Sequence, residues 1–331
     1  IREVESMQDK GWKDLKLFYS VETAQHFLEM VYKNQGMEDA KKNSYKNGER
    51  FIFFLKHAEA FYKQAKIATL EIKPILLFYG MAQLLKACLL TTDPSYPSHT
   101  SVLAHGVTTR KRKKQNYRFY EDEVKIQRNG LCMHVIRSLF QLSGLEDERF
   151  NMKQLLARIP EINKVLAFQR KPNPIVKAAV EDRLIWLPSE TPDAYNMSSK
   201  RFIEHVEYHL NWSFCREEKE GIIFSAAQKE CRPSTSTTLL YDLEHGAYYF
   251  PAERDRFLKL PEILVHYLVA YNLSMIARYE TEWWYDLLLQ SASDDYVIIQ
   301  QFLHIVESKF PYYIAELLIR KKENNKKDQL I

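Results

Sequence analysis

The feature that most constrains this chain is an apolar run, residues 75–90, which only Gln83 and Lys86 interrupt. If the run is a helix, apolar side chains cover all of its faces, which is typical of a helix surrounded by other helices. Pro74 suits the first helical turn, and the helix is expected to end near Thr91. At about 16 residues, the run is short of the roughly 20 that cross a bilayer. We therefore expect a buried core helix and no membrane partner.

Apolar side chains recur at helical spacing along most of the remaining chain. This spacing predicts helices at residues 21–32, 51–65, 131–142, 152–159, 162–168 and from Pro261 onward. We expect Phe310-Pro311 to start a last helix that runs to Leu318, because proline suits a first helical turn.

Between about residues 181 and 256, alternation and aromatic or β-branched side chains indicate strands instead. Strands are expected at 221–224, 238–241 and 247–250, with a helix at 200–210. His245-Gly246 suits a tight connection between the last two strands, because glycine tolerates positive φ. The predicted fold class is mainly α (α+β), with a small antiparallel β insertion.

The predicted organisation has three regions. Residues 1–180 form an N-terminal helical region with a basic loop at 93–130, and 181–256 form the β-containing insertion. Residues 257–331 form C-terminal helices that are expected to pack on the N-terminal region, because both have apolar faces that need burial.

Composition excludes several classes of function. The 331 residues include only nine glycines, and no GxGxxG or GxxxxGK[ST] motif for phosphate binding occurs. The four cysteines contain no CxxC pair, which leaves a zinc knuckle or a thioredoxin-like motif without support. We therefore expect no cofactor and no metal ion. Free thiols and the absence of a signal-peptide pattern favour a cytoplasmic protein.

The sharpest local feature is a run of five adjacent cations, residues 110–114. Tyr117, Phe119 and Tyr120 follow closely, so stacking surfaces lie beside charges that can bind phosphate. The alternative interpretation is a solvated loop that binds nothing. The full set of predicted anion-binding residues is His105, Arg110, Lys111, Arg112, Lys113, Lys114, Arg118, Lys125 and Arg278.

Arg278 belongs to this set because it interrupts a strongly apolar segment. One interpretation is a buried, ion-paired arginine that fixes helix packing. The other is an arginine that grips a phosphate or carboxylate in a pocket with aromatic walls.

Three stretches resemble the YaaC-like proteins of the Bacillus type: residues 76–87, residues 103–127, and residues 271–280 followed by Trp284. The likeness extends from about Phe18 to Leu318. Family members often lie beside the gene for inosine-monophosphate dehydrogenase. The resemblance therefore implies a link to guanine-nucleotide metabolism, with that enzyme as a candidate protein partner.

The chain also resembles the HEPN superfamily of helical domains, some of which are ribonucleases. The likeness rests on the apolar helix with Lys86, a His-Gly pair after a proline-rich loop, and Arg128-Asn129 followed by His134. It implies a HEPN-like helical core and, as an alternative function, a metal-independent ribonuclease that uses Arg128 and His134 as cation and general base.

The leading functional hypothesis is a non-catalytic cytoplasmic binding or regulatory protein. It would recognise an anionic partner, such as a nucleotide, RNA or an acidic protein surface, through the basic loop. A structural protein–protein interaction module with a Tyr- and Trp-rich surface is a further alternative. A homodimer is also among the hypotheses.

Overall fold

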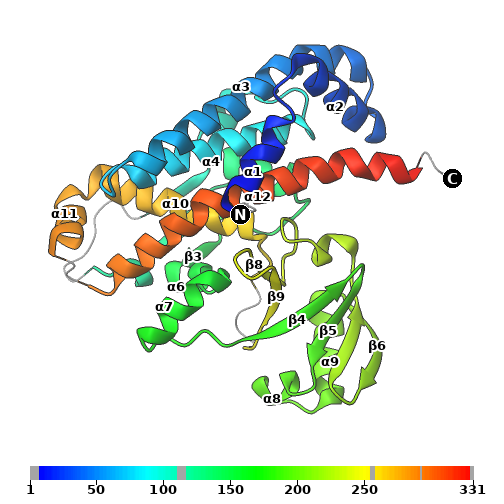
Figure 1. Ribbon diagram of the computed structural model, residues 1–331, viewed down its shortest axis with the longest axis vertical. Coiled ribbons are helices and arrows are strands. Elements are labelled where there is room, and N and C mark those ends of the chain that lie inside the picture. Colours follow the sequence, from blue (N-terminus) through cyan, green and yellow to red (C-terminus); the bar gives the residue numbers. More distant parts are fainter. Residues whose placement is uncertain (1–6, 110–116, 254–257, 291–292, 329–331) are drawn as a thin grey trace, which may run out of the picture. The chain divides into compact units, whose positions relative to one another are not determined.

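The computed structural model describes residues 7–109, 117–253, 258–290 and 293–328 (Figure 1). The chain divides into two compact units: a helical unit of residues 1–152 and 266–331, and a second unit of residues 153–265. The fold is mainly helical with small antiparallel sheets, and the predicted fold class is confirmed. The HEPN-like core stays a prediction.

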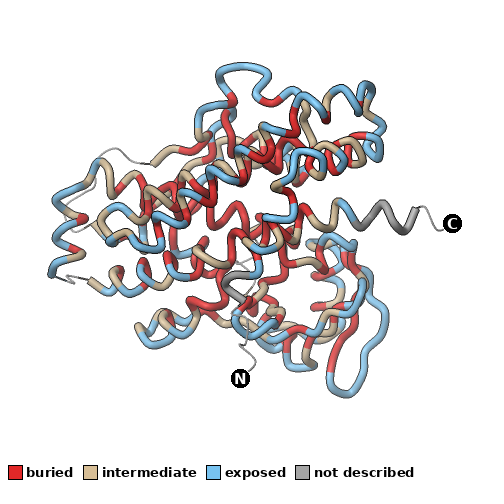
Figure 2. Tube along the Cα trace, turned by 45° about the horizontal axis from the view of Figure 1, so that its top comes forward, coloured by how far each residue is buried: buried red, intermediate tan, exposed pale blue. Residues whose placement is uncertain are grey.

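Long helices build the helical unit, and α10 enters it at His266. They are α1 (Met7–Lys16), α2 (Val21–Asn34), α3 (Ala40–Ile67), α4 (Lys73–Leu90), α5 (Leu131–Ser138), α10 (Glu262–Tyr279), α11 (Thr281–Gln290) and α12 (Asp295–Asp328). Buried positions lie on the inner faces of these helices and exposed positions on their outer faces (Figure 2).

Helix α4 is the core helix that the apolar run predicts. It packs against α3 and α12. Its contact with α3 is close, because a Cβ at Gly80 would lie only 2.6 Å from the ring of Tyr62. Among the described residues α4 alone is long and apolar enough to cross a membrane, with a mean hydropathy of 1.3, but 67% of it is buried in the fold. That burial is what a core helix of a soluble protein shows.

Two strands of a three-stranded antiparallel sheet lie in residues 93–130, the segment that was expected to be a loop. Its strands are β1 (Val107–Thr109), β2 (Glu123–Ile126) and β3 (Arg149–Asn151), in the order β1-β2-β3. Strands of three or four residues are too short to show a clear alternation of polar and apolar side chains, so no pattern predicted them.

Helix α12 corrects the expectation of a separate last helix. It continues through Pro311 without a break. Proline removes one backbone donor from the helix, but α1 packs directly on this turn. A Cβ at Gly11 would lie 2.5 Å from the backbone nitrogen of Tyr312. Packing against α1 therefore supports the helix where the local sequence disfavours it.

The second unit contains a six-stranded antiparallel sheet in the order β6-β7-β5-β4-β9-β8. The strands are β4 (Ile175–Glu181), β5 (Leu184–Pro188), β6 (Ser213–Glu218), β7 (Gly221–Ser225), β8 (Leu240–Asp242) and β9 (Ala247–Pro251). The helices of this segment are α6 (Met152–Leu156), α7 (Asn163–Phe168), α8 (Thr191–Ala194) and α9 (Ser199–Leu210). The expected strands at 221–224 and 247–250 and the helix at 200–210 are confirmed.

The two compact units divide the chain at 152/153 and 265/266, and the domain boundaries expected at 180/181 and 256/257 stay predictions. Strand β4 begins at Ile175 and pairs with β9, with Val176 opposite Phe250. The strand starts directly after the prolines at 172 and 174. A core of aromatic side chains, among them Phe202, Trp212, Phe224 and Phe250, fills this unit.

Candidate anion-binding site

One stripe of the core helix α4 is only half-buried. Tyr79, Gln83 and Lys86 form this stripe. They lie at positions i, i+4 and i+7, which share one face of a helix. The two polar interruptions of the apolar run therefore lie on one face, and they give the core helix a single partly accessible polar side.

The loop before β1 holds His105 in a fixed position. Gly106 and Gly130 have positive φ angles of +74° and +114°, and a Cβ at Gly130 would lie 2.5 Å from the backbone of Gly106. The first two amide groups of α5 donate to the carbonyls of Ala104 and His105 at 2.7 and 3.1 Å. The hydroxyl of Tyr267 also donates to the His105 carbonyl, at 3.1 Å. Three elements thus fix this loop.

Aromatic rings surround the imidazole of His105. Its ring centre lies 4.8 Å from that of Phe78, 5.8 Å from that of Tyr79 and 6.1 Å from that of Tyr271. The imidazole is half-buried, and within the described part of the chain neither of its nitrogens makes a hydrogen bond. Both nitrogens are therefore available to a ligand.

Arg278 reaches the same place from the last turn of α10. Its guanidinium donates to the Tyr79 hydroxyl at 3.2 Å, and to the carbonyl and hydroxyl of Ser274 at 2.9 and 3.3 Å. It also lies 5.8 Å from the centre of the Tyr79 ring. All these acceptors are uncharged, and no described carboxylate pairs with Arg278. The ion-paired interpretation does not fit these contacts.

Lys86 is a half-buried cation without a counterion. Its Nζ lies 6.0 Å from the ring centre of Phe54, and it makes no ion pair or hydrogen bond with any described residue. Burial lowers its pKa. Burial, together with the positive charges of Arg278 and Lys86, lowers the pKa of His105 to about 4. All the charges that act on His105 are thus positive.

We call Lys86, His105 and Arg278, with the rings of Tyr79 and Tyr271, the basic–aromatic cluster. Partly buried cations without a carboxylate cost free energy, which an added anion would offset. The neighbouring rings offer stacking and cation–π contacts to a planar group. The arrangement is therefore suited to bind an anion that carries an aromatic ring.

In a comparison with known families, the family model for the YaaC-like protein matches residues 16–318. The chain belongs to the YaaC-like protein family. No curated protein and no solved structure matches the chain. The three stretches on which the resemblance rests meet at the basic–aromatic cluster of this YaaC-like protein. They supply Lys86, His105 and Arg278 in turn. The likeness to HEPN domains stays a prediction.

Tyr271 was missing from the predicted binding residues, and so were two residues of α4, Tyr79 and Lys86. Their signal was present in the sequence, because Tyr79, Gln83 and Lys86 repeat at helical spacing within an apolar run. A polar stripe on a helix that is otherwise apolar on all sides indicates a face that is partly accessible.

The basic run, Arg110–Lys114, lies outside the described residues, and its role stays a prediction. The residues on either side of it are tied to one buried network. Thr109 Oγ1 donates to Asn272 Oδ1 at 3.2 Å, and Asn272 Nδ2 donates to Asp122 Oδ2 at 2.9 Å. The Tyr117 hydroxyl donates to the same carboxylate oxygen at 2.7 Å. Thr109 before the run and Tyr117 after it are thus anchored beside α10.

The remaining predicted cations lie apart from the cluster contacts. Lys125 and Arg128 both pair with Asp147, at 2.6 and 2.5 Å. Their hydrogen bonds lower the pKa of that carboxyl group. Arg118 is exposed, and no described residue pairs with it. Lys125 and Arg128 therefore share one carboxylate of the protein, whereas Arg118 makes no ion pair with a described residue.

The two residues of the ribonuclease hypothesis each have their own carboxylate. Arg128 pairs with Asp147, whereas Nε2 of His134 lies 2.9 Å from Asp93. The ring of His134 also packs 5.6 Å from that of Tyr96. No contact joins Arg128 to His134 within the described residues, so the ribonuclease hypothesis stays a prediction without a supporting contact.

Proposed function

We propose that this YaaC-like protein is a non-catalytic binding or regulatory protein of the cytoplasm, which recognises an anionic partner at the basic–aromatic cluster. The observation that carries the proposal is the charge balance there. Lys86 and Arg278 have no carboxylate partner among the described residues, and neither ring nitrogen of His105 makes a hydrogen bond with a residue of that part of the chain. Such a group of cations attracts negative charge.

The chemistry of the cluster favours a nucleotide as the partner. A phosphate would meet Lys86 and Arg278, and a base would meet the aromatic side chains beside them. RNA also carries both a phosphate and a base, whereas an acidic protein surface carries only the negative charge. The link to guanine-nucleotide metabolism favours a purine nucleotide, and it keeps inosine-monophosphate dehydrogenase as a candidate protein partner. A homodimer also belongs to the proposal.

Calorimetric titration with guanosine monophosphate and inosine monophosphate tests the proposal. Lys86→Met keeps an unbranched side chain of similar length and removes its charge. It should weaken nucleotide binding about tenfold or more, because a charged hydrogen bond to phosphate is lost. Lys321→Met is the matched control, since Lys321 is a half-buried lysine on α12 that makes no ion pair with described residues.

Stability separates a lost contact from a damaged fold. Both Lys86 and Lys321 have pKa values lowered by burial, so replacing either by Met should leave the melting temperature unchanged or raise it. Wild-type protein that binds neither nucleotide nor RNA, or Lys86→Met protein that binds like wild type, would overturn the proposal.

A further inference from the structure

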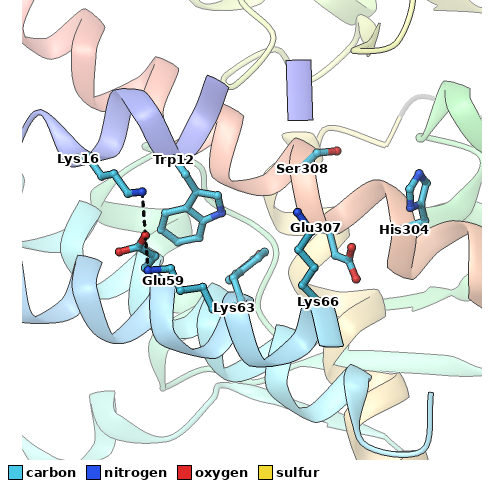
Figure 3. Close-up of a pocket in the computed structure, with 9 residues that line it drawn as sticks. Trp12, Lys16, Glu59, Lys63, Lys66, His304, Glu307 and Ser308 are labelled. Atoms are coloured by element: carbon cyan, nitrogen blue, oxygen red, sulfur yellow. Dashed lines mark ion pairs between the residues drawn. The ribbon is translucent and has the colours of Figure 1, made fainter. Parts of the chain in front are cut away.

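A second site lies on another part of the helical unit. A cavity of about 230 Å³ opens between α1, α3 and α12 (Figure 3). It shares no residue with the basic–aromatic cluster. Its volume is below the roughly 300–1,000 Å³ of typical ligand pockets, so its occupant would be a small molecule.

Close helix packing builds the cavity wall. Because Gly11 contacts the backbone of α12, the next residue, Trp12, is held over the cavity beside α3. The ring of Trp12 meets that of Tyr62 edge-on, with centres 5.2 Å apart. Figure 3 shows the Trp12 indole and the Lys66 side chain on opposite sides of the space in front of α12. The indole gives the cavity a flat apolar wall.

The acidic side chains of the cavity already have partners. Glu59 accepts ion pairs from Lys16 at 3.1 Å and from Lys63 at 3.0 Å. Glu307 pairs with Lys73 at 2.5 Å. These ion pairs contain three lysines and two carboxylates, so the lining does not favour a cationic ligand.

A buried hydroxyl and a lysine side chain of the cavity make no hydrogen bond or ion pair with any described residue. The side chain of Tyr62 is only 5% exposed, and its hydroxyl makes no hydrogen bond with any described residue. Burial and the charge of Glu307 raise its pKa well above the usual value, so the hydroxyl stays protonated and can donate. Lys66 lies one turn later on α3 and has no ion pair within the described chain. A buried donor without an acceptor is unusual in folded proteins.

We propose that this cavity binds a small aromatic carboxylate. The ring of the ligand would pack against Trp12, and its carboxylate would pair with Lys66 and accept a hydrogen bond from the Tyr62 hydroxyl. Positions i and i+4 put Tyr62 and Lys66 on one face of α3, so both can reach one carboxylate. The assignment is independent of the proposed function.

Ligand-observed NMR titration of the full chain with benzoate tests the assignment, with benzamide as the neutral analogue of the same shape. Benzoate should bind saturably and benzamide at least tenfold more weakly, because the amide lacks the charge that Lys66 meets. Tyr62→Phe removes only the hydroxyl and should weaken benzoate binding about tenfold. Lys66→Met should weaken it to a similar degree.

Two controls make the result decisive. Lys56→Met removes an exposed cation on α3 outside the cavity lining and should leave benzoate binding unchanged. Tyr62→Phe should not lower the melting temperature, because the lost hydroxyl has no partner. Absence of saturable benzoate binding, equal binding of benzamide, or unchanged affinity in both variants would each overturn the assignment. Lys86→Met protein should still bind benzoate, which separates this site from the proposed nucleotide site.

Discussion

The properties of His105 come from its neighbours more than from its own chemistry. Free imidazole titrates near neutrality, but His105 is half-buried among rings and faces two cations. It is therefore neutral at pH 7, and one of its nitrogens can donate to a phosphate while the other accepts. A ligand that brings negative charge would oppose the effect of Lys86 and Arg278 and favour the protonated ring.

An NMR titration of the His105 ring should give a pKa of about 4 in the free protein. Lys86→Met should raise this pKa, because one of the two repelling charges is lost, and burial should still keep it below the usual value. In wild-type protein, saturation with guanosine monophosphate should raise the pKa of His105 above its value in the free protein. An unchanged pKa on addition of a bound nucleotide would place the nucleotide away from the cluster.

The same shift determines how acid affects stability. The folded pKa is depressed to about 4 from a usual value of 6.5, so the unfolded chain takes up this proton first as the pH falls. The free energy of unfolding is therefore highest above pH 6.5 with respect to this group, and it decreases between pH 6.5 and 4. The free energy of unfolding of the His105→Gln variant should decrease less than that of wild type between pH 6.5 and 4. Urea titrations at each pH measure this difference.

At the scale of elements, the cluster depends on a glycine contact between two loops. Gly130→Ala adds a Cβ that would lie 2.5 Å from backbone atoms of Gly106, at a φ of +114°. We expect a loss of about 2–4 kcal/mol in the free energy of unfolding, from backbone strain and overpacking together. Gly144→Ala is the matched control. Its φ is also positive, +76°, but no atom lies within 4 Å of its added Cβ.

Denaturant unfolding of the two variants measures this difference. Gly144→Ala should cost only about 1–2 kcal/mol, the price of the left-handed conformation alone. If both variants lose the same amount, the contact between Gly106 and Gly130 does not fix the loop that carries His105.

Long helices could be predicted from the sequence because many residues contribute to each pattern. The stripe from Val21 to Tyr32 and the apolar run of α4 each repeat over several turns. The strands β1 to β3 could not be predicted in this way, because their pairing joins residues 107–109, 123–126 and 149–151 through backbone hydrogen bonds. The continuity of α12 through Pro311 likewise depends on packing by Gly11, far away in the sequence.

The candidate site could be predicted in part. His105 and Arg278 stood out as unusual polar residues, but their meeting depends on the packing of α4 and α10, which contact through Phe78 and Tyr271 with ring centres 5.5 Å apart. Lys125 also stood out, and only the structure shows its pairing with Asp147. Residue type can thus indicate a charged side chain that needs a partner. Only the folded structure shows which residue that partner is.

For the whole molecule, positive charge is concentrated in one stretch of chain. The net charge is only +4, yet five consecutive cations follow strand β1, beginning five residues after His105. If the run and the cluster bind one polyanion, the cluster would hold a terminal or looped nucleotide and the run would follow the phosphates beyond it. A mononucleotide would need the cluster alone.

Salt dependence of binding distinguishes these contributions. For single-stranded RNA, replacing Arg110–Lys114 by Ala should reduce the slope of log affinity against log salt by up to about 3.5, since each phosphate contact contributes about 0.7. The same variant should bind guanosine monophosphate like wild type. A control variant with Lys41, Lys42 and Lys46 replaced by Ala removes exposed cations of α3, and its slope for RNA should not change. An equal slope in the Arg110–Lys114 variant and in wild type would show that the run contacts no phosphate.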